Sequence, residues 1–115
     1  MDERLQKALE FSNYNLTFQN QKQNIKNRFN QLQVVHYANG VFKANPSTIS
    51  FVKALVDMGK SNTVVIDDKE NPVEIKNLQE FLDELVSAYT SATQEYDVEF
   101  NKLKRMRSIK KIMDW

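Results

Sequence analysis

The fold of this chain of 115 residues is decided by the stretch NLQEFLDELVSAY at residues 77–89. Its apolar side chains recur at alternating spacings of three and four residues, the pattern of one buried helix face. Asn77 is a suitable N-cap, and Glu80 stands at the third helical position, as in a capping box. The stretch therefore predicts the start of a long helix that buries one face.

The same spacing continues to the end of the chain, where glycine and proline are absent after residue 76. Nine of the eleven positions in this series are apolar: Leu78, Leu82, Leu85, Tyr89, Ala92, Tyr96, Glu99, Leu103, Met106, Lys110 and Met113. Such a seam is expected of a coiled coil or a helical hairpin. We therefore predict one helix over residues 77–115.

The N-terminal part of the chain predicts a second long helix, over residues 1–38. Phe11, Phe18, Ile25 and Leu32 repeat every seven residues, and we place a further set beside them on a single apolar face: Leu5, Leu9, Tyr14, Leu16 and Phe29. Amide side chains crowd the second half of this segment. Because apolar residues interrupt the amides at helical spacing, a solvated or interface-facing helix surface is expected there.

All glycines and prolines lie between Gly40 and Pro72, so residues 39–76 form a separate insert. Asn39-Gly40 either ends the first helix, with glycine in the left-handed conformation, or makes a tight hairpin between residues 34–37 and 41–43. We prefer the helix end. The insert then contains a short strand at 41–43, a helix of about ten residues that Asn45-Pro46-Ser47 starts and Gly59 stops, and a β-hairpin from residue 63 to 75.

These elements predict a mainly α protein with a small β insert. The economical arrangement is a long antiparallel helical hairpin with a strand, helix and β-hairpin as its head, in one domain over residues 1–115. The flanking helices would be roughly 45 to 55 Å long. Without an apolar run of membrane-spanning length or a signal peptide at the start, the sequence predicts a small soluble intracellular domain.

Known catalytic and metal-binding patterns are missing from the sequence. The chain has no cysteine and a single histidine, His36, which excludes thiol chemistry and multi-histidine metal sites within one chain. Phosphate-binding glycine loops and the Gly-x-Ser-x-Gly elbow are also absent. Residues 67–71 have the composition of a calcium loop but lack its glycine and distal glutamate, so a solvated turn is expected. We predict no enzyme activity, no catalytic or metal-binding residue and no cofactor.

The charge distribution is the one unusual feature of the sequence. Residues 67–99 contain ten acidic and two basic residues, whereas residues 100–115 contain six basic residues and one acidic residue. A basic helix end is favoured by the helix dipole, but it also suits an acidic partner, nucleic acid or a neighbouring copy. Candidate partner-binding residues are Lys102, Lys104, Arg105, Arg107, Lys110, Lys111 and Trp115.

Two interpretations of this C-terminal segment remain open. It could dock on a neighbouring chain, with Trp115 as an anchor of the kind that is frequent in interfaces. Alternatively, its apolar face could pack on the chain's own N-terminal turns. That packing would bring the acidic residues near the start of the chain close to the basic segment, namely Asp2, Glu3 and Glu10 close to Arg105, Arg107 and Lys110.

Several short segments, together with the basic C-terminal helix, resemble small structural proteins of T-even-type tailed bacteriophages and cyanophages. They are residues 5–11, 20–22, 39–42, 65–67 and 71–74, and the minor prohead core proteins are the nearest family. The resemblance implies a scaffold inside the immature capsid, without catalytic residues. Core proteins of this kind are cut after a hydrophobic-x-Glu sequence followed by a small residue, whereas Glu80 and Glu84 precede Phe81 and Leu85.

We therefore expect a non-enzymatic viral structural or assembly protein that acts through helical interfaces. Its partners would be further copies of itself or other phage assembly proteins, with nucleic acid only weakly indicated and no membrane. The expected location is the host cytoplasm or the virion. The alternative is a small regulatory protein that binds nucleic acid or a host protein through the basic C-terminal helix.

Overall fold

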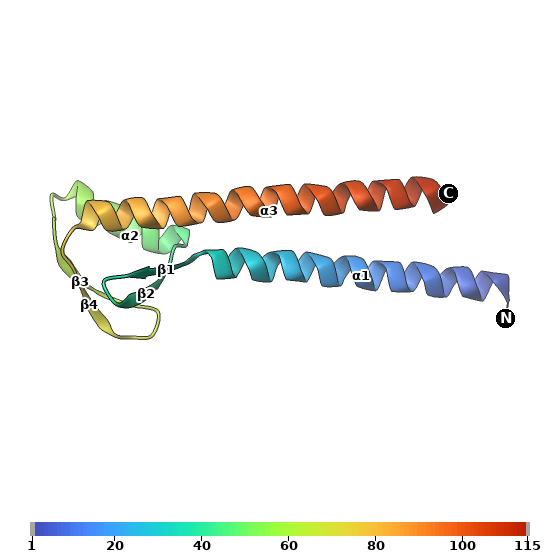
Figure 1. Ribbon diagram of the computed structural model, residues 1–115, viewed down its shortest axis with the longest axis horizontal. Coiled ribbons are helices and arrows are strands. Elements are labelled where there is room, and N and C mark those ends of the chain that lie inside the picture. The colour runs from blue at the N-terminus through green and yellow to red at the C-terminus, as the bar shows by residue number, and fades with distance from the viewer. Residues whose placement is uncertain (1, 115) are drawn as a thin grey trace. The chain divides into compact units, whose positions relative to one another are not determined.

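The computed structural model describes residues 2–114, with the side chains of residues 2–13 and 15–106. Three helices and four strands follow one another along the chain (Figure 1). They are α1 (Glu3–Leu32), β1 (Val34–Tyr37), β2 (Gly40–Lys43), α2 (Pro46–Asp57), β3 (Thr63–Ile66), β4 (Pro72–Ile75) and α3 (Leu78–Asp114). The strands form two separate antiparallel pairs, β1 with β2 and β3 with β4. The predicted mainly α class with a small β insert is confirmed.

The chain divides into two compact units. One unit combines the chain up to Arg28 with the chain from Glu95 onward, and therefore holds most of α1 and the C-terminal part of α3. The other unit, Phe29–Gln94, holds all four strands, α2 and the first turns of α3.

The first hairpin corrects the sequence prediction. Helix α1 ends at Leu32 instead of residue 38, because Val34 and Val35 already belong to β1, where β-branched side chains are favoured. The segment that contains the strands, which we call the β-region, thus begins at Val34 instead of residue 39. It consists of a hairpin, a helix and a second hairpin. Ala38 and Asn39 both have positive φ, at 49° and 67°, as the tight turn between paired strands requires.

Gly40 has a packing role instead of the predicted left-handed one. It pairs with Tyr37 at the first position of β2, and its φ is not positive. A Cβ atom at this position would stand 2.7 Å from Cγ2 of Val73 on the second hairpin. Carbon atoms in contact lie about 3.5 to 4.0 Å apart. Only glycine therefore lets the two hairpins approach this closely.

Helix α2 begins and ends at the predicted signals. The Asn45 side chain accepts a hydrogen bond of 2.8 Å from the Thr48 amide, and Pro46 occupies the first helical position. At the other end Gly59 takes a φ of 83°, and its amide donates to the Val56 carbonyl while the next amide donates to the Leu55 carbonyl. This pattern is a Schellman motif, which glycine favours because it has no side chain.

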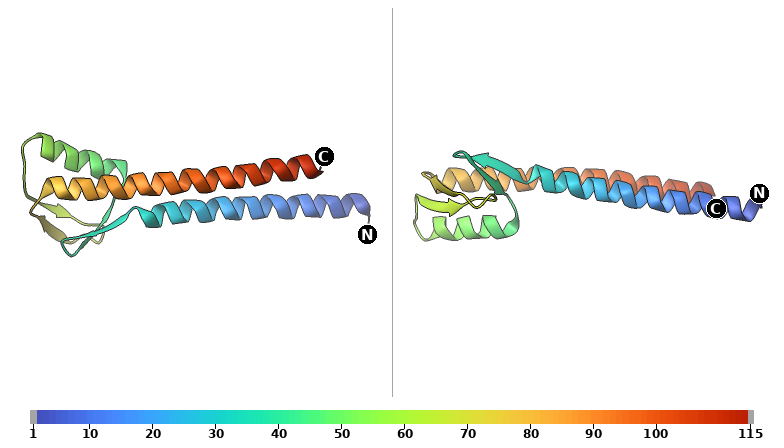
Figure 2. Two further views of the ribbon diagram at one scale, coloured as in Figure 1. Left: turned by 45° about the horizontal axis from the view of Figure 1, so that its top comes forward. Right: turned by 90° about the horizontal axis from the view of Figure 1, so that it is seen from below.

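The core of the second unit forms where α2 and both hairpins surround the first turns of α3 (Figure 2). Its fully buried large side chains are Phe81, Ile75, Leu78, Leu85 and Val52. The Asn77 side chain accepts from the Glu80 amide at 3.1 Å, so the predicted N-cap of α3 is confirmed. The predicted seam is buried or half-buried from Leu78 to Leu103, whereas Met106 is exposed and the side chains of Lys110 and Met113 lie outside the described residues.

Candidate interaction surfaces

The turn at residues 67–71 is a structural element of the second hairpin. Asp67 is buried, and its two carboxylate oxygens accept hydrogen bonds from the backbone amides of Val41, Lys69 and Asn71 at 2.8 to 3.0 Å. These bonds, led by that from Val41, hold the pKa of the Asp67 carboxyl below its usual value. The Asp68 amide also donates to the Val41 carbonyl at 2.7 Å. Asp67 therefore ties the second hairpin to β2, and its prediction as a solvated residue is wrong.

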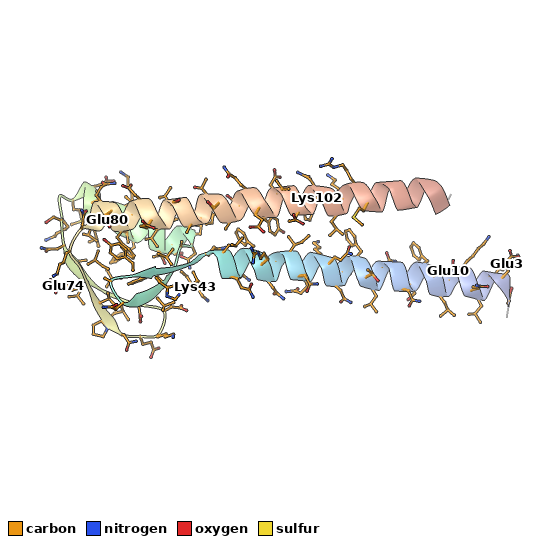
Figure 3. All side chains as sticks on the ribbon, in the orientation of Figure 1. Glu3, Glu10, Lys43, Glu74, Glu80 and Lys102 are labelled. Atoms are coloured by element: carbon orange, nitrogen blue, oxygen red, sulfur yellow. The ribbon has the colours of Figure 1, made fainter. Side chains whose placement is uncertain are left out.

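Tyr37 connects the first hairpin to the first turn of α3. Its ring lies 5.1 Å from that of Phe81, and its hydroxyl interacts with the Glu80 carboxylate. Burial raises the pKa of the Tyr37 phenol, and the carboxylates of Glu80 and Glu84 raise it further. A phenol that stays protonated suits a structural hydrogen bond. We therefore assign Tyr37 and Glu80 to the packing of this unit, and Figure 3 shows Glu80 at the start of α3.

Within the described residues, no group of three or more His, Cys, Asp or Glu side chains could hold a metal ion. His36 is exposed on β1, beside the buried Val35. Asp83 is exposed on α3 and accepts a hydrogen bond from Gln79 at 3.0 Å. The interaction surfaces are thus the features that remain for functional interpretation.

The basic segment is described only in its first part. Lys102, Lys104 and Arg105 are exposed on α3, and Lys102 forms an ion pair of 3.3 Å with Glu99 one turn earlier. The side chains of Arg107, Lys110 and Lys111, and the whole of Trp115, lie outside the described residues. Among described residues, Arg105 forms no ion pair with Asp2, Glu3 or Glu10. The predicted close approach of these three acids to Arg105 is therefore not observed there.

Helix α1 has two apolar faces, so the prediction of a single face is wrong. At 100° per residue, Phe18, Ile25 and Phe29 share one side of the helix and are half-buried. Leu5, Leu9 and Leu16 lie on the opposite side and are 52%, 45% and 61% exposed. We call these three residues the leucine face. The spacing of these leucines, which are four and seven residues apart, can be recognised in the sequence. It was missed because the leucines were placed on the same helix face as the phenylalanines.

A second apolar surface lies in the unit that holds the strands. Phe51 from α2 and Val64 and Ile66 from β3 are exposed around a hollow of about 520 Å³. Lys43 and Asp68 also line this hollow. The arrangement of α2 beside the second hairpin, which brings together residues distant in the sequence, places Phe51 at this hollow.

No helix within residues 2–114 combines the length and the apolar character that crossing a membrane requires. Comparison of the chain with protein-family models, with curated proteins and with solved structures found no match.

Proposed function

We propose that this chain is a non-enzymatic structural or assembly protein that binds other proteins through its helices. The observation that carries the proposal is the leucine face, which exposes three large apolar side chains along one side of α1. Apolar side chains gathered in this way on a protein surface are typical of sites that bind another protein. The resemblance of short segments to phage prohead core proteins suggests a scaffold role, in the host cytoplasm or the virion.

The proposed architecture is an antiparallel pair of α1 and α3, with the β-region and α2 as a head. Two contacts support it, each inside one unit. Arg28 Nε lies 3.3 Å from Glu95 Oε1, and the rings of Phe29 and Tyr89 pack edge to face at 6.4 Å. Phe29 follows Arg28 on α1, whereas its partner Tyr89 precedes Glu95 on α3. This reversed order is the one that antiparallel helices give.

The electrostatic contribution of the Arg28–Glu95 ion pair is small. Both side chains are well exposed, and such pairs contribute about 0 to 1 kcal/mol. The pair therefore marks the register of the two helices, whereas apolar burial supplies most of the stability. In the proposed pairing, most of the stability therefore comes from burial of the side of α1 that holds Phe18 and Ile25.

The test compares protein association with nucleic acid binding for the full chain. Sedimentation equilibrium over a range of concentrations should give a mass that rises above that of one chain, and DNA binding followed by fluorescence anisotropy should be weak. The proposal would be contradicted by a chain that stays monomeric at every concentration and whose DNA affinity falls steeply between about 50 and 200 mM salt. Such a fall indicates phosphate contacts, because these contacts release counterions. That result would favour the regulatory alternative, with Lys102, Lys104 and Arg105 as phosphate contacts.

A further inference from the structure

We infer that a second copy of this chain docks on the leucine face of α1, parallel to the first copy and in register with it. The inference rests on the proposed function and names its partner. The leucine face is exposed along its whole length, whereas on the opposite side of α1 Phe18 and Ile25 are half-buried and Phe11, nearer the start of the helix, is exposed.

The leucine face follows the spacing of a coiled-coil seam. Leu5, Leu9, Ser12 and Leu16 are separated by four, three and four residues, so they form one continuous stripe. The same spacing continues beyond Leu16 through exposed polar side chains, those of Gln19, Gln23, Lys26 and Asn30. The stripe is thus apolar in its first half and polar in its second half.

This division favours a parallel pair. In a parallel, in-register pair, leucine meets leucine in the first half, and the amides of Gln19 and Gln23 meet their counterparts in the second. Lys26 also meets Lys26 there, and a lysine in a seam costs stability but specifies register. A full-length antiparallel pair of α1 (Glu3–Leu32) would set Leu5 and Leu9 against the side chains of Asn30 and Lys26. Burying polar groups against leucine is unfavourable unless they find partners. Buried polar residues in a seam are also known to fix its register.

The charges beside the stripe allow identical helices to approach. The flanking positions of the apolar half are Gln6, Ala8, Asn13 and Asn15, and none of them is charged, whereas Lys22 flanks the stripe beside Gln23 in the second half. Like charges at these positions would repel in a pair of identical helices. The flanks of the leucine face are therefore neutral over the length of its apolar half.

The length of α1 also favours a parallel pair over a shifted antiparallel one. The 30 residues of α1 span about 45 Å, so full-length contact along a helix about 11 Å wide covers roughly 500 Å² on each copy. The total of about 1,000 Å² reaches the lower limit for a specific interface. An antiparallel pair that sets Leu5 against Leu16 overlaps only over residues 3–18 of α1 and covers roughly 500 Å² in total, the size of a crystal contact.

The first test introduces charge into the leucine face of the full chain. Leu9→Glu and Leu16→Glu should each weaken self-association at least tenfold in sedimentation equilibrium, because two like charges would meet in the parallel seam. Met58→Glu is the matched control, since Met58 is exposed at the end of α2, and it should leave association unchanged. Circular dichroism checks that the helix content of each variant equals that of the original chain.

The second test determines orientation by oxidative cross-linking, for which the chain is suited because it has no cysteine. Leu5→Cys should form a disulfide between two copies, while the control Lys7→Cys, on the other side of the helix, should not. In the shifted antiparallel pair the two Leu5 positions are about 16 Å apart, beyond the roughly 7 Å that a disulfide spans.

The outcomes separate this inference from the proposed function. A chain that associates equally well with Glu at residues 9 and 16 uses another surface, which overturns the inference and leaves the proposed function standing. Association that Leu9→Glu abolishes without any cross-link through Leu5→Cys overturns the parallel register. A chain that stays monomeric at millimolar concentration overturns the inference and removes the main support for the proposed function.

Discussion

Replacing Gly40 with alanine tests how the two hairpins pack. The added Cβ would stand 2.7 Å from Cγ2 of Val73 and 2.8 Å from Cε2 of Phe42, about 1 Å closer than carbon atoms normally approach. Phe42 and Val73 are both buried, so neither side chain can move freely into solvent. Overpacking of this kind costs about 1 to 3 kcal/mol. We therefore expect Gly40→Ala to lower the free energy of unfolding by that amount in urea denaturation.

A double-mutant cycle shows whether the cost arises from this contact. Val73→Ala alone should destabilise the protein by removing buried methyl groups, but in combination with Gly40→Ala it should cost less than the sum, by at least about 0.5 kcal/mol. Gly59→Ala is a matched control, because its cost comes from a φ of 83° in open space, and Val73→Ala should not relieve it. Additive effects of the first pair, or a Gly40→Ala cost below about 0.5 kcal/mol, would refute the packing argument.

Two further substitutions test the core and the turn. Leu85→Ala should lower the free energy of unfolding by about 2 to 5 kcal/mol in urea denaturation, because Leu85 is fully buried. Val86→Ala, at a neighbouring exposed position, should change it by no more than about 0.5 kcal/mol. Equal costs would mean that the wrong helix face is assigned to the core. Asp67 has a lowered pKa in the folded state, so its carboxylate stabilises the fold above pH 4 and loses this effect as the pH falls further. Asp67→Asn should therefore lower the thermal midpoint most at neutral pH, and the difference from the original chain should shrink below about pH 4; a constant difference would contradict this role.

Sequence patterns predicted the elements whose signals are local. The N-caps Asn45 and Asn77 and the left-handed Gly59 each act on residues within one turn of themselves, and all three behave as expected. The seam of α3 is equally local, because a period of three and four residues places Leu78 and Leu85 on the same face. These signals sufficed for α2, α3 and the second hairpin.

The remaining features depend on residues that are distant in the sequence. Gly40 looked like a helix end because the contact that requires glycine comes from Val73. Asp67 looked like a solvated turn residue because one of its hydrogen-bond donors is Val41 on the first hairpin. The end of α1 was misplaced for a related reason, since the strand formed by Val34 and Val35 depends on its partner β2.

The central claim is that α1 and α3 form an antiparallel pair, and distances between spin labels test it most directly. One doubly labelled variant carries cysteines at residues 28 and 95, and the other at residues 21 and 102, seven residues further from the first contact on each helix. The labelled chain is diluted into unlabelled chain, so that only distances within one molecule are measured. Antiparallel packing predicts nearly equal distances for the two pairs, whereas helices that splay apart at about 50° beyond the first contact would lengthen the second distance by roughly 9 Å and contradict the claim.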